Sequence, residues 1–460
     1  MSVYDAVYRY GVFPALQRKR GQDLLAALRE ADRELSASPE EILKLQRERL
    51  QAILRHAGTT CPFWRRRFAA ADLDPRDVKD VEDLRRLPIL EKDEVRRNLS
   101  EMLSSAIRTE DRFPAWTGGS TAAPMKFFRD RDCLRIREAY GWVVHGWHGR
   151  KPHHRSALIW GASQDLAENQ GWRTRLRERL IDRTIVLPGN RLDDASLARF
   201  AEQLNAFDPP YLHGYSQAVH RFAQSLRRTG RAAPNLRAVT VTAESMTEEQ
   251  RRQAESVFEC PVHRIYGTRE FGFLAAECED RRGMRINPLN AVVEFIAPDG
   301  SPARPGEPGQ VVVTDLLNRA TPLIRYRIGD VGTLAANSNP QCERFPRMEI
   351  SAGRETDFIV TPEGKWISGA AITLVHAPGI VEVQYVQEVA ERLTVRYVAD
   401  ENFQAESLAE LRRRLRETFG DGLDYAFQQV AAIGLTDSGK RQYVRSNVAR
   451  RALGLINQSA

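Results

Sequence analysis

WTGGSTAAPMKFF, residues 116–128, gathers two glycines and three hydroxyl side chains between aromatic residues. Adjacent glycines allow positive φ angles and leave no Cβ to block a ligand. Consecutive N–H groups and hydroxyls can then converge on an anion, most often phosphate. The spacing does not fit the GxxxxGK[ST] loop. The stretch therefore predicts a phosphate-binding loop of another kind, with a solvated turn as the alternative. The predicted contacts are Thr117, Gly118, Gly119, Ser120 and Thr121.

The segments around this loop predict an α/β fold. Residues 1–110 contain amphipathic runs such as EEILKLQRERLQAILRHA and predict helices. From about 112 to 350, apolar runs such as SALIWGA and LRAVTVTAE alternate with helical stretches, which predicts a mostly parallel sheet covered by helices. The run AVVEFIAPDGSPARPGEPGQVVVTDL predicts two antiparallel strands. Past Gly353, two alternating strands, a helix and a final strand near QQVAAIGL predict a small α+β domain.

The composition is that of a soluble enzyme with room for more than one core. The chain has 460 residues, of which 42% are hydrophobic and 28% charged. No apolar run is long enough for a membrane span, and the N-terminus has no secretory pattern. Five scattered cysteines indicate a reducing compartment, so we expect a cytoplasmic protein without membrane insertion.

The net charge of +7 raises the question of nucleic acid. Acids dilute the basic residues throughout, as in LRERLIDR, which favours solvated amphipathic helices. No nucleic-acid recognition module is present, so no nucleic-acid partner is expected. Lysine is rare beside arginine, which makes a lysine in a glycine motif, such as Lys440, more notable.

The predicted phosphate loop is the first of five motifs that follow one another in a fixed order. They are TGGSTAAPMK at 117–126, AES at 243–245, YGTREFG at 266–272, RYRIGD at 325–330 with GRETD at 353–357, and SGK at 438–440. The set resembles the adenylate-forming superfamily of acyl-CoA synthetases, and more narrowly the branch of phenylacetate–CoA ligase and the CapK-like proteins. The resemblance implies a large adenylate-forming domain over residues 1–352, a hinge at 353–357 and a small mobile domain over 358–460.

The YGTREFG motif supplies the nucleotide contacts that the resemblance implies. Tyr266 would stack on the adenine of ATP, Thr268 would contact the α-phosphate and Glu270 would hold Mg²⁺, a hard cation that prefers carboxylate oxygen. The alternative is a buried tyrosine and a surface glutamate at a strand end. The resemblance adds to the nucleotide site Gly267, Ala243 and Glu244.

The RYRIGD and GRETD motifs imply the ribose contacts. Asp330 would accept both ribose hydroxyls, since a carboxylate is an acceptor with two oxygens. Arg327 could pair with it on the surface. Arg354 resembles the arginine beside the hinge, with a linker charge as the alternative. Thr356 stands where relatives usually carry aspartate, which would restrict rotation of the small domain.

Lys440 resembles the single lysine that the mobile domain brings to the reacting centre. Attack of a carboxylate on the α-phosphate concentrates negative charge, and one preorganised ammonium there lowers the barrier by ~3–4 kcal/mol. The alternative is an exposed lysine in a turn. The resemblance thus implies three catalytic residues: Lys440, Thr268 and Glu270.

Two departures from the resemblance affect the predicted ligands. Ala122, Ala123 and Pro124 replace the usual Gly-Lys/Glu-Pro after the phosphate loop. Some relatives carry a zinc site, of which Cys278 and Cys342 match two positions. Two thiolates do not close a tetrahedral site, so no zinc is predicted. The remaining positions of that site carry Arg285 and Pro340, and the Cys260–His263 pair favours a core histidine at 263.

The acyl site is predicted from HGYSQAVHRF at 213–222, with Trp160, His213 and Tyr215 as its lining or as ordinary core residues. The reaction implied is ATP-dependent activation of a small carboxylic acid, followed by transfer to CoA. Because IVTPEGKWISGAAI lacks the Pro-x-Glu-x-Glu pattern of CoA-using relatives, an amine or sugar acceptor remains an alternative. A non-catalytic nucleotide-binding partner in a polysaccharide or secondary-metabolite pathway is another. A monomer or homodimer is expected.

Overall fold

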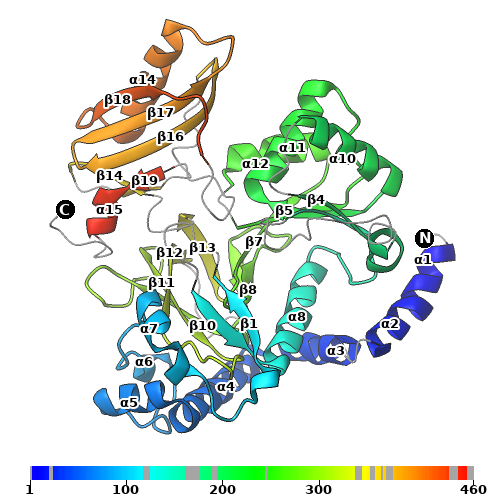
Figure 1. Cartoon of the computed structure of the whole chain (residues 1–460), viewed down its shortest axis with the longest axis vertical. Helices are drawn as coiled ribbons and strands as arrows, with labels where there is room; N and C mark the ends of the chain where they lie inside the picture. The colour runs from blue at the N-terminus through cyan, green and yellow to red at the C-terminus, as the bar shows by residue number, and fades with distance from the viewer. Residues whose placement is uncertain are drawn as a thin grey trace.

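A computed structural model describes most of the chain. The described residues are 3–19, 24–117, 125–160, 177–188, 194–243, 246–336, 344–352, 358–363, 366–368, 377–434 and 444–452. Figure 1 shows the N-terminal helices along one side, a large sheet region in the middle and a separate C-terminal sheet region.

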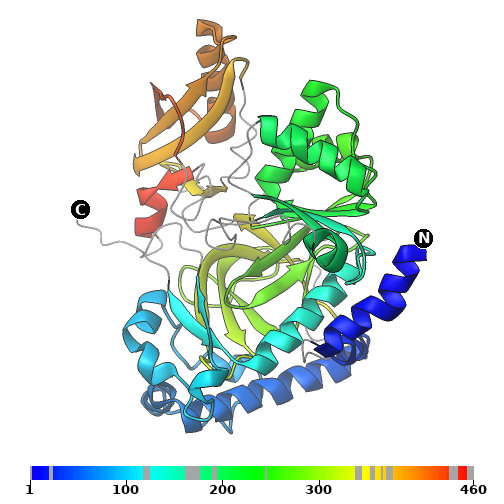
Figure 2. The same cartoon turned by 45° about the vertical axis from the view of Figure 1, so that its right-hand side comes forward.

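Residues before the phosphate-loop hairpin are helical, as predicted. The elements are α1 (Val3–Val7), the π-helical turn η1 (Tyr8–Val12), α2 (Phe13–Lys19), α3 (Leu24–Leu35), α4 (Pro39–Thr60), α5 (Pro62–Ala70), α6 (Val81–Leu84), α7 (Lys92–Met102) and the short η2 (Thr109–Asp111). The longest of them, α4, begins at a capping box in which the Ser38 hydroxyl accepts from the Glu41 N–H, and the Glu41 carboxylate accepts from the Ser38 N–H. Figure 2 shows α3 and α4 running beneath the sheet region.

The chain then enters a two-stranded hairpin and a sheet of eleven described strands. The hairpin is β1 (Phe113–Trp116) and β2 (Lys126–Arg129). The sheet strands are β3 (Ser156–Trp160), β4 (Thr184–Pro188), β5 (Tyr211–Tyr215), β6 (Ala238–Thr242), β7 (Val262–Thr268), β8 (Gly272–Ala276), β9 (Met284–Ile286), β10 (Ala291–Ile296), β11 (Pro308–Asp315), β12 (Tyr326–Leu334) and β13 (Arg347–Ala352). Their order across the sheet is β10-β11-β12-β13-β9-β8-β7-β6-β5-β3-β4.

The prediction of a mostly parallel sheet was wrong for half of these strands. The strands β4, β3, β5, β6 and β7 pair in parallel, but every described pairing from β7 to β10 is antiparallel. The links from β7 to β8 and from β8 to β9 are short, whereas a parallel pairing needs a long crossover. The predicted antiparallel pair of β10 and β11 is confirmed.

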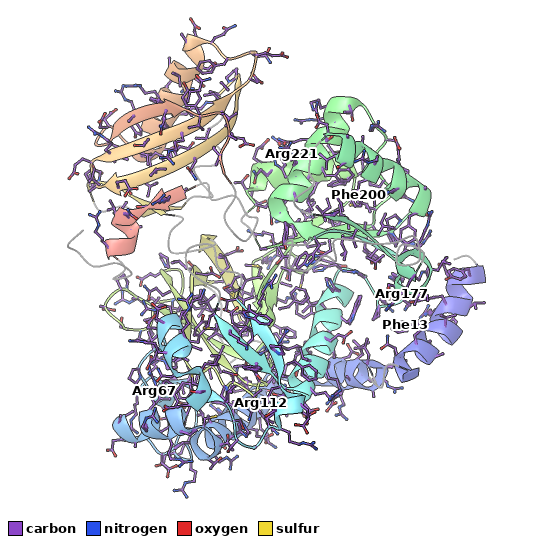
Figure 3. The ribbon with its side chains drawn as sticks, viewed as in Figure 1. Phe13, Arg67, Arg112, Arg177, Phe200 and Arg221 are labelled. Carbon is purple, nitrogen blue, oxygen red and sulfur yellow. The ribbon has the colours of Figure 1, made fainter. Side chains whose placement is uncertain are left out.

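Helices cover the parallel half and supply its core. They are α8 (Arg131–Gly146), the π-helical turn η3 (Glu178–Asp182), α10 (Asp194–Phe207), α11 (Ser216–Thr229) and α12 (Glu248–Phe258). One core lies between α10–α12 and β3–β7 and includes Phe200, which Figure 3 shows on α10. A second core joins α4–α7 to the antiparallel strands. In open α/β sheets ligands bind outside the carboxyl ends of the parallel strands, so we expect a site at that edge.

The C-terminal region has a core of its own. Its elements are β14 (Phe358–Val360), β15 (Trp366–Ser368), β16 (Ile380–Val389), β17 (Arg392–Ala399), α14 (Ala405–Phe419), β18 (Asp424–Gln429), β19 (Val444–Ser446) and α15 (Asn447–Ala452). Four of them form a sheet in the order β18-β17-β16-β19, with α14 packed on it. The final strand was predicted near QQVAAIGL; β18 ends at Gln429, and β19 was not predicted. We propose the domain boundary near Gly353, since residues 353–357 lie outside the described ranges.

Candidate active site

The predicted phosphate loop sits at the tip of the β1–β2 hairpin, with both of its ends held. The Thr117 N–H donates to the Met125 carbonyl at 2.9 Å, and the Met125 N–H donates to Thr117 Oγ1 at 3.0 Å. Thr117 is buried. The ends of the loop are therefore pinned across the hairpin, while Gly118, Gly119, Ser120, Thr121 and the two alanines after them lie outside the described residues.

Two of the predicted nucleotide contacts touch each other. Tyr266 on β7 donates its hydroxyl to Asp330 Oδ2 on β12 at 2.6 Å, although the two lie far apart in the sequence. Asp330 is 8% exposed. The suggested Asp330–Arg327 pair was wrong, because Arg327 Nε lies 3.1 Å from Glu91 Oε1 instead. The Tyr266 ring and the Asp330 carboxylate thus form one polar unit that can offer an aromatic face and an acceptor to the same ligand.

The turn after β7 carries Thr268 and Glu270. Thr268 Oγ1 accepts from the Phe271 N–H at 3.2 Å, so its own O–H remains available to donate. Glu270 is buried, and its carboxylate faces the hydroxyl of Tyr326. Burial raises the pKa of Tyr326 well above its usual value, and the Glu270 charge raises it further. Tyr326 also lies 3.8 Å from the Met125 sulfur, so this turn and the base of the hairpin are close neighbours.

The predicted acyl lining forms a stack at the carboxyl ends of β3 and β5. The Trp160 ring stacks on His213 at 5.1 Å and on Tyr215 at 4.8 Å between centroids. His213 Nδ1 lies 2.8 Å from Thr240 Oγ1. The structure brings the three residues together, and residues 161–176, which follow Trp160 in the sequence, lie outside the described residues.

The stack is uncharged near neutral pH. Burial lowers the pKa of His213 to about 3, and the Arg150 guanidinium nearby lowers it further. His145 lies edge-on to His213 at 5.4 Å, and its pKa is lowered in the same way. His213 therefore offers an aromatic surface without a positive charge, which suits the body of an acyl group better than its carboxylate.

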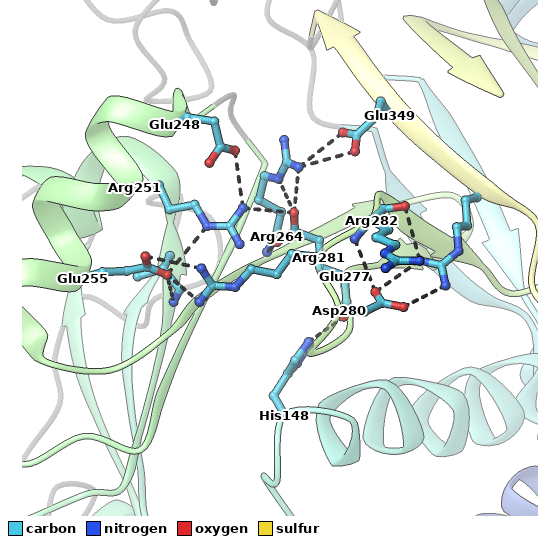
Figure 4. A network of polar contacts seen from close by, with 12 residues as sticks. His148, Glu248, Arg251, Glu255, Arg264, Glu277, Asp280, Arg281, Arg282 and Glu349 are labelled. Atoms are coloured by element: carbon cyan, nitrogen blue, oxygen red, sulfur yellow. Dashed lines mark hydrogen bonds and ion pairs between the residues drawn. The ribbon is translucent and has the colours of Figure 1, made fainter. Parts of the chain in front are cut away.

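The first residue of the AES motif has an unusual backbone. Ala243 follows β6 with φ +70°, a region that costs a non-glycine residue of order 1 kcal/mol or more and that recurs at functional sites. Glu244 lies outside the described residues. Figure 4 shows a polar network between α12 and β7, where Glu277 accepts from Arg264 Nε at 2.7 Å and from Arg251 Nη1 at 3.2 Å. The network joins α12 to β7 and so supports the strand that carries Tyr266.

Cys278, at one of the possible zinc positions, is a buried thiol. Burial raises the pKa of Cys278 to about 11, and Arg285 donates to Asp280 at 3.0 Å. His263 is buried, as predicted, and stacks on His148 at 4.3 Å. Among the residues that the structure describes, no three His, Cys, Asp or Glu side chains meet as a metal cluster. Cys342 falls outside that set.

Several predicted site residues cannot be located. Lys440, Arg354 and the hinge at 353–357 lie outside the described residues.

A cavity of about 320 Å³ lies between α4, α6 and β10, away from the stack and the hairpin. Within the described ranges, no helix is long and apolar enough to cross a bilayer.

Sequence reasoning missed one group beneath the site. Arg137 on α8 donates to the Glu270 carbonyl at 2.6 Å and to Asp315 Oδ2 at 2.6 Å, on the buried face of the helix. Arg137 follows buried Cys133 by four residues and precedes buried Tyr140 by three. An arginine at a core-facing helical position was the signal that could have found it.

Comparison with known proteins finds relatives that match most of the chain. Residues 359–447 match the family model of the CapK C-terminal domain. Protein CapK of Staphylococcus aureus is 23% identical over 419 residues, covering 89% of this chain and 90% of that protein. The phenylacetate–coenzyme A ligase of Escherichia coli strain K12 is 26% identical, covering 71% of this chain and 74% of that enzyme. The chain is a homologue of CapK and of the phenylacetate–coenzyme A ligases. The prediction of the family is confirmed.

A solved structure agrees with this homology at the level of the fold. The crystal structure of 2-hydroxyisobutyryl-CoA ligase in the postadenylation state has a TM-score of 0.70 at 21% identity, covering 92% of this chain and 93% of that one. The CapK homologue therefore has the α/β fold with a C-terminal domain that its motifs predicted.

Proposed function

We propose that the chain is an ATP-dependent carboxylate-activating ligase. A carboxylate oxygen attacks the α-phosphorus of ATP, the bond to the β-phosphate oxygen breaks, and pyrophosphate leaves. An acceptor then attacks the carbonyl carbon of the acyl- or aryl-adenylate and releases AMP. Homology to the phenylacetate–coenzyme A ligases supports an AMP-forming ligase.

The 2.6 Å hydrogen bond between Tyr266 and Asp330 carries the proposal. These are the residues assigned to adenine and ribose, and they meet although they belong to strands that are not neighbours in the sheet. Glu270, on the same strand–turn segment as Tyr266, offers a carboxylate suited to Mg²⁺. The metal would neutralise charge on the phosphates, while Thr268 and Thr117 offer donors beside them.

The acceptor is proposed to be the thiol of coenzyme A. The matching phenylacetate–coenzyme A ligases cover about 70% of the chain, and their names carry this acceptor. CapK matches 89% of the chain, including the C-terminal region. Because the segment IVTPEGKWISGAAI lacks the Pro-x-Glu-x-Glu pattern of CoA-using relatives, an amine or a sugar is the second candidate. The identity of the acid is left to the acid panel below. The protein is proposed to be a monomer or a homodimer.

Pyrophosphate release across a panel of aliphatic and aromatic acids tests the proposal. Each acid is supplied with MgATP alone, with coenzyme A, and with a set of amines and amino sugars. Release with at least one acid is expected, and the acceptor that accelerates AMP formation identifies the second step. A chain that binds ATP but releases no pyrophosphate with any acid is the non-catalytic partner instead.

Substitutions of Asp330 and of Tyr266 should weaken ATP binding to different extents. Asp330→Ala leaves the ribose hydroxyls without their acceptor. It should weaken ATP binding by ~1–3 kcal/mol, which appears as a higher KM for ATP. Tyr266→Phe keeps the ring and loses only the hydroxyl that orients Asp330, so its effect should be smaller. Initial rates of pyrophosphate exchange at varied ATP measure both.

Tyr425→Phe is the matched control for these variants. Its hydroxyl donates to the Gly420 carbonyl at 2.8 Å in the C-terminal region, so the same group is lost far from the nucleotide. Equal ATP kinetics in Asp330→Ala, Tyr425→Phe and the wild type would remove the nucleotide assignment of Asp330.

A further inference from the structure

Arg137 is a buried cation that the proposed chemistry leaves without a role. Its side chain is 7% exposed and that of its partner Asp315 is fully buried. The guanidinium donates to the Glu270 carbonyl at 2.6 Å, to Asn290 Oδ1 at 3.3 Å and to Asp315 Oδ2 at 2.6 Å. A planar fork with acceptors on several sides fixes the groups around it in direction as well as in distance.

On one side of Arg137 lies the turn that carries Thr268 and Glu270. Asn290 Nδ2 donates to the carbonyls of Phe271 at 2.8 Å and Phe273 at 3.0 Å. Between them Gly272 has φ +66°, and a Cβ there would lie 3.5 Å from the Arg137 side chain. Arg137 and Asn290 together hold three carbonyls of this turn, so its path is set from below by side chains of α8 and of the segment before β10.

On the other side lies the hairpin that carries the predicted phosphate loop. Asp315 Oδ1 accepts from the N–H groups of Leu317 at 2.9 Å and Asn318 at 3.1 Å. Asn318 Nδ2 donates to the Phe128 carbonyl on β2 at 2.9 Å, and the Phe128 N–H donates to Thr321 Oγ1 at 3.1 Å. The loop from Asp315 to Thr321 therefore holds the second strand of the hairpin.

We propose that Arg137 is a positioning residue whose pairing with Asp315 fixes the turn 268–273 relative to the β1–β2 hairpin. The inference rests on the proposed function, in which the turn and the hairpin loop grip the same triphosphate and its Mg²⁺. The turn and the hairpin are both tied to the buried Arg137–Asp315 pair, so the distance between them is fixed before the nucleotide binds. A shift of about 1 Å between groups that hold a reacting phosphate costs about 10²-fold in rate.

Arg137→Lys tests the role, since lysine keeps the charge but cannot serve three acceptors as a fork. We expect the kcat of pyrophosphate exchange to fall by about tenfold or more, and the Mg²⁺ concentration for half-maximal rate to rise. Arg183→Lys is the matched control. Arg183, directly before β4, has a side chain that is 4% exposed, pairs with Asp5 and donates to the His153 carbonyl at 3.2 Å, at the β4 edge of the sheet. It should lower the unfolding temperature and leave the Mg²⁺ dependence unchanged.

A double-mutant cycle tests the coupling between the two sides. Asn318→Ala loosens the hairpin from its support, and we expect the pair Arg137→Lys with Asn318→Ala to lose less than the product of the two single losses. If Arg137→Lys does not fold, Asn290→Ala loosens the same turn, keeps the ion pair, and carries the same expectation. Independent losses, or an Arg137→Lys variant with wild-type kcat and Mg²⁺ dependence, overturn the inference.

Amide hydrogen exchange separates this inference from the proposed function. Arg137→Lys should speed exchange in residues 266–274 and in the hairpin together, and Arg183→Lys in neither. That readout needs no turnover, so it holds even for a wild-type chain that releases no pyrophosphate. Faster exchange confined to α8 counts against the positioning role.

Discussion

Lys440→Ala is expected to lose about two orders of magnitude in ATP–pyrophosphate exchange while it still binds ATP. Negative charge gathers at the α-phosphate during attack by the carboxylate, and one preorganised ammonium there supplies ~3–4 kcal/mol. Lys440→Arg should also be slow, because a planar fork does not replace a compact point charge. Exchange rates with saturating ATP, beside ATP binding measured separately, give the two quantities.

The exposed residue Lys44 on α4 provides the control. Its ammonium lies 4.0 Å from Glu48 on the solvent side, so Lys44→Ala removes the same charge without a role in the site. Wild-type exchange in Lys440→Ala would end the assignment of this lysine. Loss of exchange in both variants would point to a general effect of charge.

Mild acid should destabilise the protein before its carboxylates titrate. Burial lowers the pKa of His213 and of His263 to about 3, whereas an unfolded histidine titrates near its usual value of about 6.5. The folded state therefore binds fewer protons than the unfolded state between these values, and stability falls as the pH falls. The loss is ~1.4 kcal/mol per pH unit for each histidine, or ~4 kcal/mol for the pair between pH 7 and pH 5.

Chemical unfolding at pH 7, 6 and 5 measures this loss. His213→Asn removes one titrating ring, so its free energy of unfolding should change less with pH than that of the wild type. The lowered pKa values of His145 and His148 act in the same direction. The raised pKa values of Glu294 and Glu349 act in the opposite direction, since their protonated forms are favoured by burial. A wild-type stability that stays level from pH 7 to pH 5 contradicts the prediction.

Most strands of the large sheet could be predicted from the sequence, but apart from the β10–β11 pair their partners could not. Runs such as SALIW and AVTVT are apolar, short and bounded by turns, which is enough to predict β3 and β6. The placement of β13 between β12 and β9 leaves no trace in either pattern, because periodicity shows which face is buried and not which strand lies beside it. For that reason the antiparallel half of the sheet was not predicted as such.

The site residues that belong to sequence motifs could be predicted. A residue whose role depends on contacts between segments far apart in the sequence could not. Tyr266, Asp330 and the Trp160 stack come from named motifs, and the structure brings each set together. Their roles remain predictions. Arg137 belongs to no motif, and its meaning depends on Asp315 and Glu270, which are more than a hundred residues away. Only the folded chain shows that such partners meet.

Among the described residues, one small apolar cluster joins the C-terminal region to the strand that carries Asp330. Val331 on β12, Val360 on β14 and Ala449 on α15 form this small apolar cluster, with Val448 at its edge. Burial of so few methyl groups is worth only a few kcal/mol, at about 0.8 kcal/mol for each methylene. As separate molecules, two surfaces of this kind would meet rarely at cellular concentrations.

The two regions belong to one chain, and this raises the expected occupancy of the contact between them. A short linker gives the tethered partner an effective concentration in the mM range, so a weak contact is occupied for a useful fraction of the time and still released quickly. Additional apolar side chains around Val331 and Ala449 would lengthen each residence rather than add a new interaction. We therefore expect the cluster to act as a low-affinity contact that the C-terminal region can leave readily.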